Sequence, residues 1–67
     1  MITNESIIKH FIVQYEELKQ NHITYDVMNM DEIEDVVALY AEMNDIFNNV
    51  TFAKNKKNLI ITVYKVK

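Results

Sequence analysis

Cysteine, glycine and proline are all missing from this sequence of 67 residues. Without cysteine the chain can form neither a disulfide nor a thiolate metal site, and this is typical of proteins in a reducing compartment. Without glycine it cannot form the loops that cradle phosphates, because those loops need the close backbone approach that glycine allows. Nucleotide-binding loops of that type are therefore excluded.

Arginine and long apolar runs are absent as well. Every basic residue is a lysine, and no run of about 18 apolar residues is present, so no segment is predicted to span a membrane. The first residues, MITNESIIKHF, lack the basic region that begins a secretory signal. The many Asn, Lys and Ile residues are typical of an AT-rich coding sequence. We therefore expect a cytoplasmic protein of a bacterial host cell.

The composition that remains is typical of a folded protein. Hydrophobic residues make up 49% of the chain and charged residues 25%, which favours a globular domain over disorder. At this length we expect a single domain spanning 1–67. Because so small a domain buries only about 60% of its unfolded surface, its core is marginal and oligomerisation often stabilises such chains. The sequence leaves monomer and homodimer equally open.

Hydrophobic periodicity predicts a helix, a strand and a second helix in the first part of the chain. Residues 4–20 form the first helix, and residues 23–28 alternate as a strand does. The second helix covers 29–47, with Asn29 and Glu32 forming a capping box. Its apolar residues recur at helical spacing, so we expect one buried stripe. The stripe consists of Ile33, Val36, Val37, Tyr40, Met43 and Phe47.

The remaining residues predict a hairpin and complete the fold. Residues 50–53 and 59–66 form two strands, joined by a five-residue loop over 54–58. The helix between the first two strands makes them parallel. The last strand is apolar on both faces, which is typical of a central strand. The sequence therefore predicts an α+β fold in the order α-β-α-β-β, with two helices packed on one face of a three-stranded mixed sheet of order 1-3-2.

Charge is distributed unevenly along the chain. Residues 26–53 contain seven carboxylates and no basic residue, whereas residues 54–67 contain five lysines and no acidic residue. On the predicted second helix, most of these carboxylates lie opposite the buried stripe, and two apolar residues seven positions apart flank them. The resulting face consists of Asp31, Glu34, Asp35, Glu42 and Asp45, with Leu39 and Ile46 beside it.

This acidic face has two interpretations. Carboxylates in the first turn of a helix are favoured by the helix dipole, which accounts for Asp31, Glu34 and Asp35 without any partner. The same effect disfavours Glu42 and Asp45, which lie toward the other end. Solvated helix faces usually mix charges of both signs, because opposite charges four residues apart are stabilising. The face is either ordinary solvated surface or a surface that binds a basic partner.

On the second interpretation, the chain is a non-enzymatic inhibitor or regulator. Its acidic face would mimic nucleic acid and occupy a basic surface of a larger, nucleic-acid-handling protein. In size and charge the chain is similar to phage and mobile-element proteins of the anti-defence type, which inhibit restriction enzymes, CRISPR effectors or polymerases. The alternative is a nucleic-acid-binding domain that uses the lysine-rich hairpin, with lysines on phosphates and an aromatic ring on bases. Its contact residues would be Lys54, Lys56, Lys57 and Tyr64.

The sequence offers no candidate catalytic, cofactor or metal site. The two histidines, His10 and His22, are twelve residues apart, and residues 31–35 lack the glycine and the spacing of a calcium loop. Acid–base catalysis by paired carboxylates needs a cleft that desolvates one of them. Because a domain of this size has little room for such a cleft, we expect no enzymatic activity and no cofactor.

Overall fold

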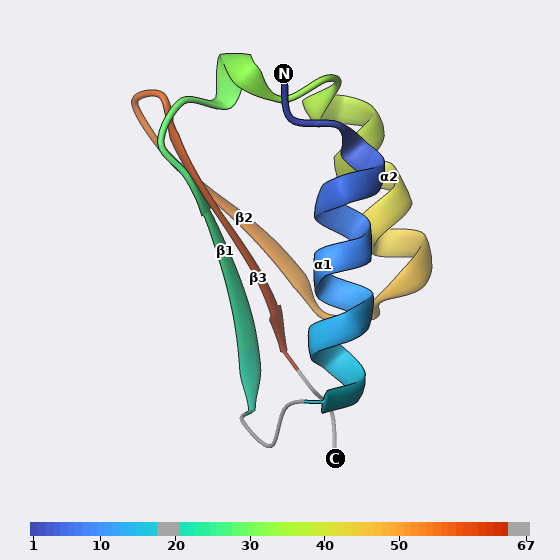
Figure 1. Cartoon of the computed structure of the whole chain (residues 1–67). Helices are drawn as coiled ribbons and strands as arrows, with labels where there is room; N and C mark the ends of the chain where they lie inside the picture. Colours follow the sequence, from blue (N-terminus) through green and yellow to red (C-terminus); the bar gives the residue numbers. More distant parts are fainter. Residues whose placement is uncertain (18–20, 65–67) are drawn as a thin grey trace.

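Two helices cover one face of a three-stranded sheet (Figure 1). The computed structural model describes residues 1–17 and 21–64. Its elements are α1 (Asn4–Glu17), β1 (His22–Val27), the short 3-10 helix η1 (Met30–Glu32), α2 (Val36–Ile46), β2 (Val50–Asn55) and β3 (Asn58–Tyr64). The predicted α+β class and element order are confirmed, and residues 18–20 of the predicted first helix lie outside the described residues.

The sheet has the strand order β1-β3-β2, so β3 is the central strand as predicted. Ile61 of β3 lies opposite Tyr25 of β1 on one side and opposite Phe52 of β2 on the other. Both pairings are antiparallel, so the prediction of a mixed sheet is wrong. Strands β1 and β2 do run in the same direction, as expected for strands joined through a helix. They are not hydrogen-bonded to each other, because β3 lies between them.

Alternation along the strands places the core between the sheet and the helices. Leu59, Ile61 and Val63 of β3 are buried, whereas the residues between them point to the open face of the sheet. Ile23 and Val27 of β1 are buried in the same layer. Helices α1 and α2 supply Ile7, Phe11, Leu39 and Met43, and two residues that flank α2, Ile33 and Phe47, complete the buried core.

Helix α1 begins where the sequence predicts. The backbone N–H of Ser6 donates to Oγ1 of Thr3 at 3.2 Å, which satisfies one free amide of the first turn. Ile7 and Phe11 are fully buried, and Tyr15 is half-buried. Within residues 1–17 and 21–64, no helix has both the length and the hydropathy needed to cross a membrane.

The second helix is shorter than predicted. Asn29 caps only η1, where its side chain accepts from the backbone N–H of Asp31. The chain is then extended at Ile33, and α2 begins after Asp35, whose side chain accepts from the N–H of Ala38 at 3.1 Å. The prediction of a capping box is wrong. The contact between the two residues is a backbone hydrogen bond, in which the N–H of Glu32 donates to the carbonyl of Asn29.

A contact distant in sequence causes this break. Ile2 forms a parallel bridge with Ile33. The N–H of Ile2 donates to the carbonyl of Glu32 at 2.6 Å, and the N–H of Glu34 donates to the carbonyl of Ile2 at 2.8 Å. Both bonds require extended backbone at residue 33, so tertiary pairing replaces the helix that local propensity favours.

The break also changes which face of the second helix is buried. Leu39 is 0% exposed, whereas Val37 is 81% and Tyr40 52% exposed. The predicted stripe is therefore wrong at Val37 and Tyr40. Because α2 begins at Val36, Ile33 lies outside the helix, and its burial does not determine which side of α2 is buried. The buried face consists of Leu39 and Met43, with half-buried Val36.

The hairpin turn is tighter than predicted. Asn55 and Asn58 are paired, which leaves a two-residue turn of Lys56 and Lys57 in place of the expected five-residue loop. Lys56 has φ 57, in the left-handed region. Two-residue hairpins that match the twist of their strands need such an angle, which glycine adopts most readily. This chain has no glycine, so a lysine occupies the position.

Candidate functional site

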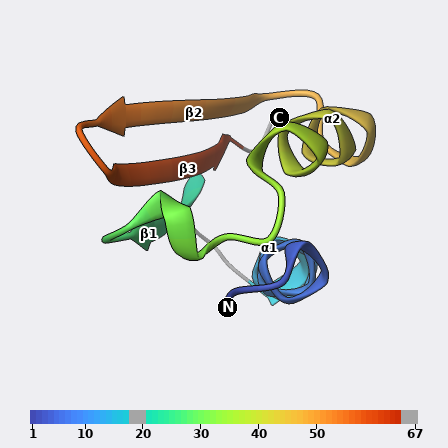
Figure 2. The same ribbon diagram turned by 90° about the horizontal axis from the view of Figure 1, so that it is seen from above.

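An open groove runs between α1 and α2, which lie side by side in both ribbon views (Figures 1 and 2). Its volume is about 820 Å³, which falls within the range of ligand sites. One wall comes from the first two turns of α1, the other from α2, and the segment before α2 lines one end. The lining residues are Asn4, Glu5, Ile8, Glu34, Asp35, Ala38, Glu42, Asp45 and Ile46.

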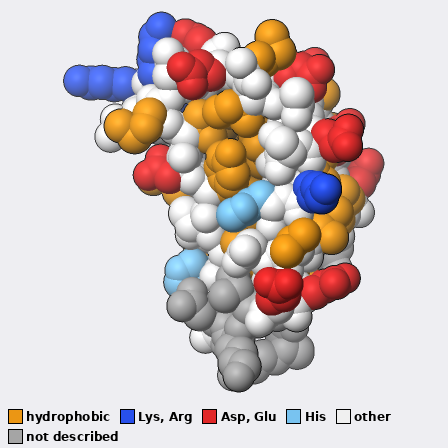
Figure 3. Space-filling view, in the orientation of Figure 1, with side chains coloured by type: hydrophobic (Ala, Val, Ile, Leu, Met, Phe, Trp, Pro, Cys, Tyr) orange, Lys and Arg blue, Asp and Glu red, His pale blue; other side chains and the backbone are white. Residues whose placement is uncertain are grey.

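The groove is strongly acidic and partly apolar. Five of its lining residues carry carboxylates, and none of the described residues that line it is basic. Ile8 is half-buried and Ile46 is 49% exposed, so apolar surface is accessible between the charges. In the space-filling view, several acidic side chains follow the right-hand edge of the molecule over the helices, with one basic side chain among them, and the other basic side chains in view lie at the upper left corner beside further acidic ones (Figure 3). We call this feature the acidic groove.

Asn4 joins the two walls at the end of the acidic groove. Its side chain donates to the carbonyl of Asp35 at 2.9 Å and accepts from the N–H of Asp35 at 3.2 Å. Its backbone N–H donates to a carboxylate oxygen of Glu34 at 3.1 Å. Asn4 is itself buried, so these bonds are protected from water. The start of α1 is thereby held against the start of α2.

The four carboxylates that α2 and the segment before it contribute to the acidic groove fall into two groups. Glu34 and Asp35 also support the fold, the first through Asn4 and the second as the cap of α2. Among the residues that the structure describes, the carboxylates of Glu42 and Asp45 have no hydrogen-bond or ion-pair partner. These two are exposed and lie toward the C-terminal end of α2, where the helix dipole disfavours them. Their local environment therefore gives them no stabilising role.

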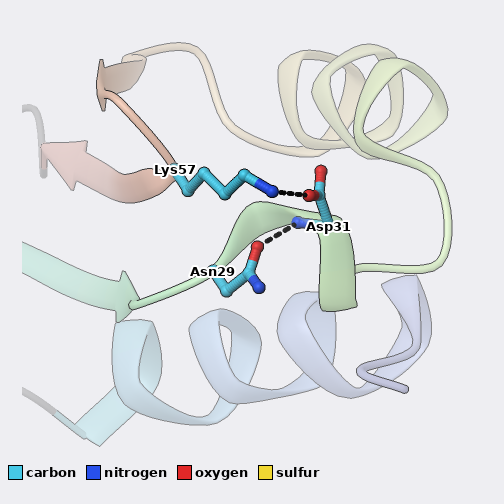
Figure 4. A network of polar contacts seen from close by, with 3 residues as sticks. All are labelled: Asn29, Asp31 and Lys57. Carbon is cyan, nitrogen blue, oxygen red and sulfur yellow. Dashed lines mark hydrogen bonds and ion pairs between the residues drawn. The ribbon is translucent and has the colours of Figure 1, made fainter.

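Asp31 was predicted to share one helical face with the others, and this is wrong. It lies in η1, and its carboxylate accepts from Nζ of Lys57 at 2.7 Å (Figure 4). This is the only ion pair within the described ranges. The hydrogen bond and the charge of Lys57 lower the pKa of Asp31, and Asp31 in turn raises the pKa of Lys57. Asp31 therefore has a counter-ion and does not line the acidic groove.

Leu39 was predicted to flank the acidic face, but the structure places it elsewhere, and two residues of α1 that were not predicted line the acidic groove. Leu39 lies in the core and cannot contact a partner from the surface. Glu5 and Ile8 line the acidic groove opposite Glu42 and Ile46. Their spacing of three residues does place them on one side of α1. Nothing in the sequence shows that this side faces the second helix.

The lysine-rich hairpin does not form one site with Tyr64. Lys54 and Lys56 are exposed near the turn, but Lys57 is engaged with Asp31. Tyr64 is at the other end of β3, about 20 Å away at the usual rise of a strand. The centroid of its ring lies 6.3 Å from the ring centroid of His22. The remaining lysines of the C-terminal segment, Lys65 and Lys67, lie outside the described residues.

Replacing Asn4 by alanine should lower the free energy of unfolding by about 1–3 kcal/mol, because the N–H and carbonyl of Asp35 lose their partner at a protected position. Urea unfolding followed by circular dichroism measures this. Asn44→Ala is the matched control, since its side chain bonds the carbonyl of Tyr40 at an exposed position. The control should cost less than about 0.5 kcal/mol. Equal losses in the two variants would contradict the role given to Asn4.

Comparison of the chain with protein-family models, curated proteins and solved structures gives no match. Its function is therefore argued from the chemistry of the acidic groove. Within the described residues, no group of three or more His, Asp or Glu side chains is arranged to hold a metal ion. What the acidic groove offers is a row of negative charge beside accessible apolar carbon, which suits a ligand that is both cationic and partly apolar.

Proposed function

We propose that this protein is a non-enzymatic binding module whose acidic groove docks on a basic surface of a larger, nucleic-acid-handling protein and blocks it. The observation that carries the proposal is the convergence of carboxylates from α1, from the segment before α2 and from α2 on one groove, whose described lining contains no basic residue. Complementary potentials of this kind steer a partner to the surface and fix its orientation. The protein would act in the cytoplasm of a bacterial cell.

The charges at the acidic groove are costly unless something neutralises them. Glu42 and Asp45 have no partner among the described residues, and like charges close together on a helix are destabilising. A partner rich in lysine or arginine would remove this repulsion. The apolar carbon of Ile8 and Ile46 would supply the desolvated centre of the interface, where most of the binding energy of protein complexes is found.

Proteins that hold nucleic acid present lysine and arginine to the phosphates, and this contact supplies much of their affinity. Helix α2 has 11 residues and is therefore about 16 Å long, with Asp35 capping its start and Glu42 and Asp45 toward its end, so these three carboxylates form a rigid row of negative charge. Such a row can occupy a groove made for a phosphate backbone. Inhibition of this kind is the activity expected of a phage or mobile-element anti-defence protein.

The proposal is tested by nuclear magnetic resonance with a defined basic probe. We expect a deca-arginine peptide added to ¹⁵N-labelled protein to shift the amide signals of residues 4–8, 34–38 and 42–46, because these surround the acidic groove. The shifts should decrease as salt is raised, since exposed charges are screened over about 8 Å at physiological ionic strength. A short DNA duplex is added to a second sample.

Two outcomes would contradict the proposal. Glu16, Glu17 and Asp26 are exposed and do not line the acidic groove. Equal shifts at these residues would show that the peptide binds through the overall charge of the protein alone. Shifts at 54–58 on addition of the DNA duplex would instead favour the alternative nucleic-acid-binding function of Lys54 and Lys56.

A further inference from the structure

Helix α2 exposes a second side, which carries no charge. On a helix of 3.6 residues per turn, Val37, Tyr40, Ala41 and Asn44 lie on one side, away from Glu42 and Asp45. All four are exposed. Because the acidic side of α2 faces α1, this uncharged side faces away from α1, in the direction of β2 (Figure 2).

The uncharged side borders an apolar groove over the sheet. Met30, Val37, Tyr40 and Phe52 line this groove, whose volume is about 290 Å³. Among the described residues of its lining, only Lys54 is charged. The rings of Tyr40 and Phe52 meet edge to face, with centroids 5.1 Å apart. Apolar surface gathered in this way on a small protein usually marks an interaction site.

Strand β2 borders the same region and is an edge strand. It pairs with β3 on one side, and no strand in the described part of the chain pairs with its other side (Figure 2). Its sequence, VTFAKN, contains a single charge, at Lys54. Unpaired backbone groups along such an edge are a template for another strand.

We propose that this face is the interface of a two-fold homodimer, in which β2 pairs antiparallel with β2 of a second copy. The two three-stranded sheets would join into one of six strands. Val37 and Tyr40 of each copy would then cover the apolar groove of the other. A two-fold axis brings the same patch of both subunits together, so the patch must be complementary to itself.

The charge distribution identifies a second copy as the occupant. Two copies that approached through their acidic grooves or through their hairpin turns would bring like charges together. In an antiparallel pairing centred on Phe52, Lys54 of each strand lies opposite Val50 of the other, so the two lysines are at opposite ends of the paired segment. Within the described part of the molecule, the face formed by β2 and the apolar groove is therefore complementary to the same face of a second copy.

The homodimer is independent of the proposed function and compatible with it. Glu42 and Asp45 lie on the side of α2 that faces α1, so both acidic grooves stay open in the dimer. A partner with two basic surfaces could then bind both copies. Failure of the dimer would leave docking at a single acidic groove unaffected, and the two proposals are therefore tested separately.

Sedimentation equilibrium tests the homodimer. We expect the mass to rise from 8.0 kDa toward twice that value as the protein concentration is raised to about 1 mM. Val37→Lys/Tyr40→Lys should remain a monomer, because it places four like charges at the two-fold axis. The matched control is Ile12→Lys/Val13→Lys, which charges two apolar residues of α1 that are each 41% exposed and should dimerise as the wild type does.

Amide hydrogen exchange identifies the edge that pairs. On going from dilute to concentrated protein, some amides of residues 50–55 should exchange at least tenfold more slowly, whereas those of 22–27 at the other edge should not change. Circular dichroism confirms that each variant is folded. A wild type that stays monomeric to about 1 mM would overturn the proposal. So would a dimer that protects 22–27, or one that the α1 control abolishes and the α2 variant does not.

Discussion

Replacing Leu39 by alanine should remove most of the stability of this protein. Leu39 is fully buried between α2 and the sheet, and leucine-to-alanine changes in such sites cost about 2–5 kcal/mol. A domain of 67 residues has a total stability of roughly 3–10 kcal/mol at the usual 0.05–0.15 kcal/mol per residue. We therefore expect a variant that is largely unfolded at 37 °C or unfolds at much lower urea concentration.

Val37→Ala is the matched control for Leu39→Ala, since both truncate an aliphatic side chain of α2. Val37 is 81% exposed, so its truncation should change the free energy of unfolding by less than about 0.5 kcal/mol. The comparison is made at low micromolar concentration to exclude effects of association. A helix running unbroken from residue 29 would give the reverse order, because it buries Val37 and exposes Leu39. A larger loss for Val37→Ala would therefore contradict the structure.

Reversing the charge of Glu42 and Asp45 should weaken binding to a basic partner at least tenfold. Both carboxylates line the acidic groove and neither contributes a described hydrogen bond, so the double variant Glu42→Lys/Asp45→Lys should fold normally. Lysine is also favoured near the C-terminal end of a helix. Coupling of close charge pairs across an interface is commonly above 1.4 kcal/mol, which corresponds to a factor of ten.

Glu16→Lys/Glu17→Lys is the matched control for the acidic groove, because it changes the net charge by the same amount at exposed positions at the far end of α1. Affinity for a deca-arginine peptide, and for a host protein recovered with the wild type, is measured by calorimetry at two salt concentrations. The control should lose no more than about threefold in physiological salt, where distant charges are screened. Equal losses in both variants would mean that overall charge, and not the acidic groove, determines binding.

Much of the fold could be predicted from local patterns alone. The apolar residues of α1 recur every three to four positions, and those of β1 alternate, so the type and the buried face of these two elements follow from their geometry. The central place of β3 followed from its apolar residues on both faces. The uneven distribution of charge could also be seen in the sequence. It predicted one surface containing Glu34, Asp35, Glu42, Asp45 and Ile46, all of which line the acidic groove.

The phase of the second helix could not be predicted, because the bridge between Ile2 and Ile33 joins residues 31 positions apart. This bridge ends the helical pattern before Val36, buries Leu39 and moves Asp31 to a pairing with Lys57. Local sequence preference carries no information on such a contact.

The sequence by itself determined the α-β-α-β-β order of the main elements, the central strand and the excess of acid in the middle of the chain, since these depend on residue type and near-neighbour spacing. Only the tertiary structure decided that Glu5 and Ile8 face Glu42 and Ile46, through the bonds of Asn4 to the segment before α2. It also decided that α2 has one acidic and one uncharged exposed side. The physical reason is that a helix presents every side, and only packing against another element selects the ones that remain accessible.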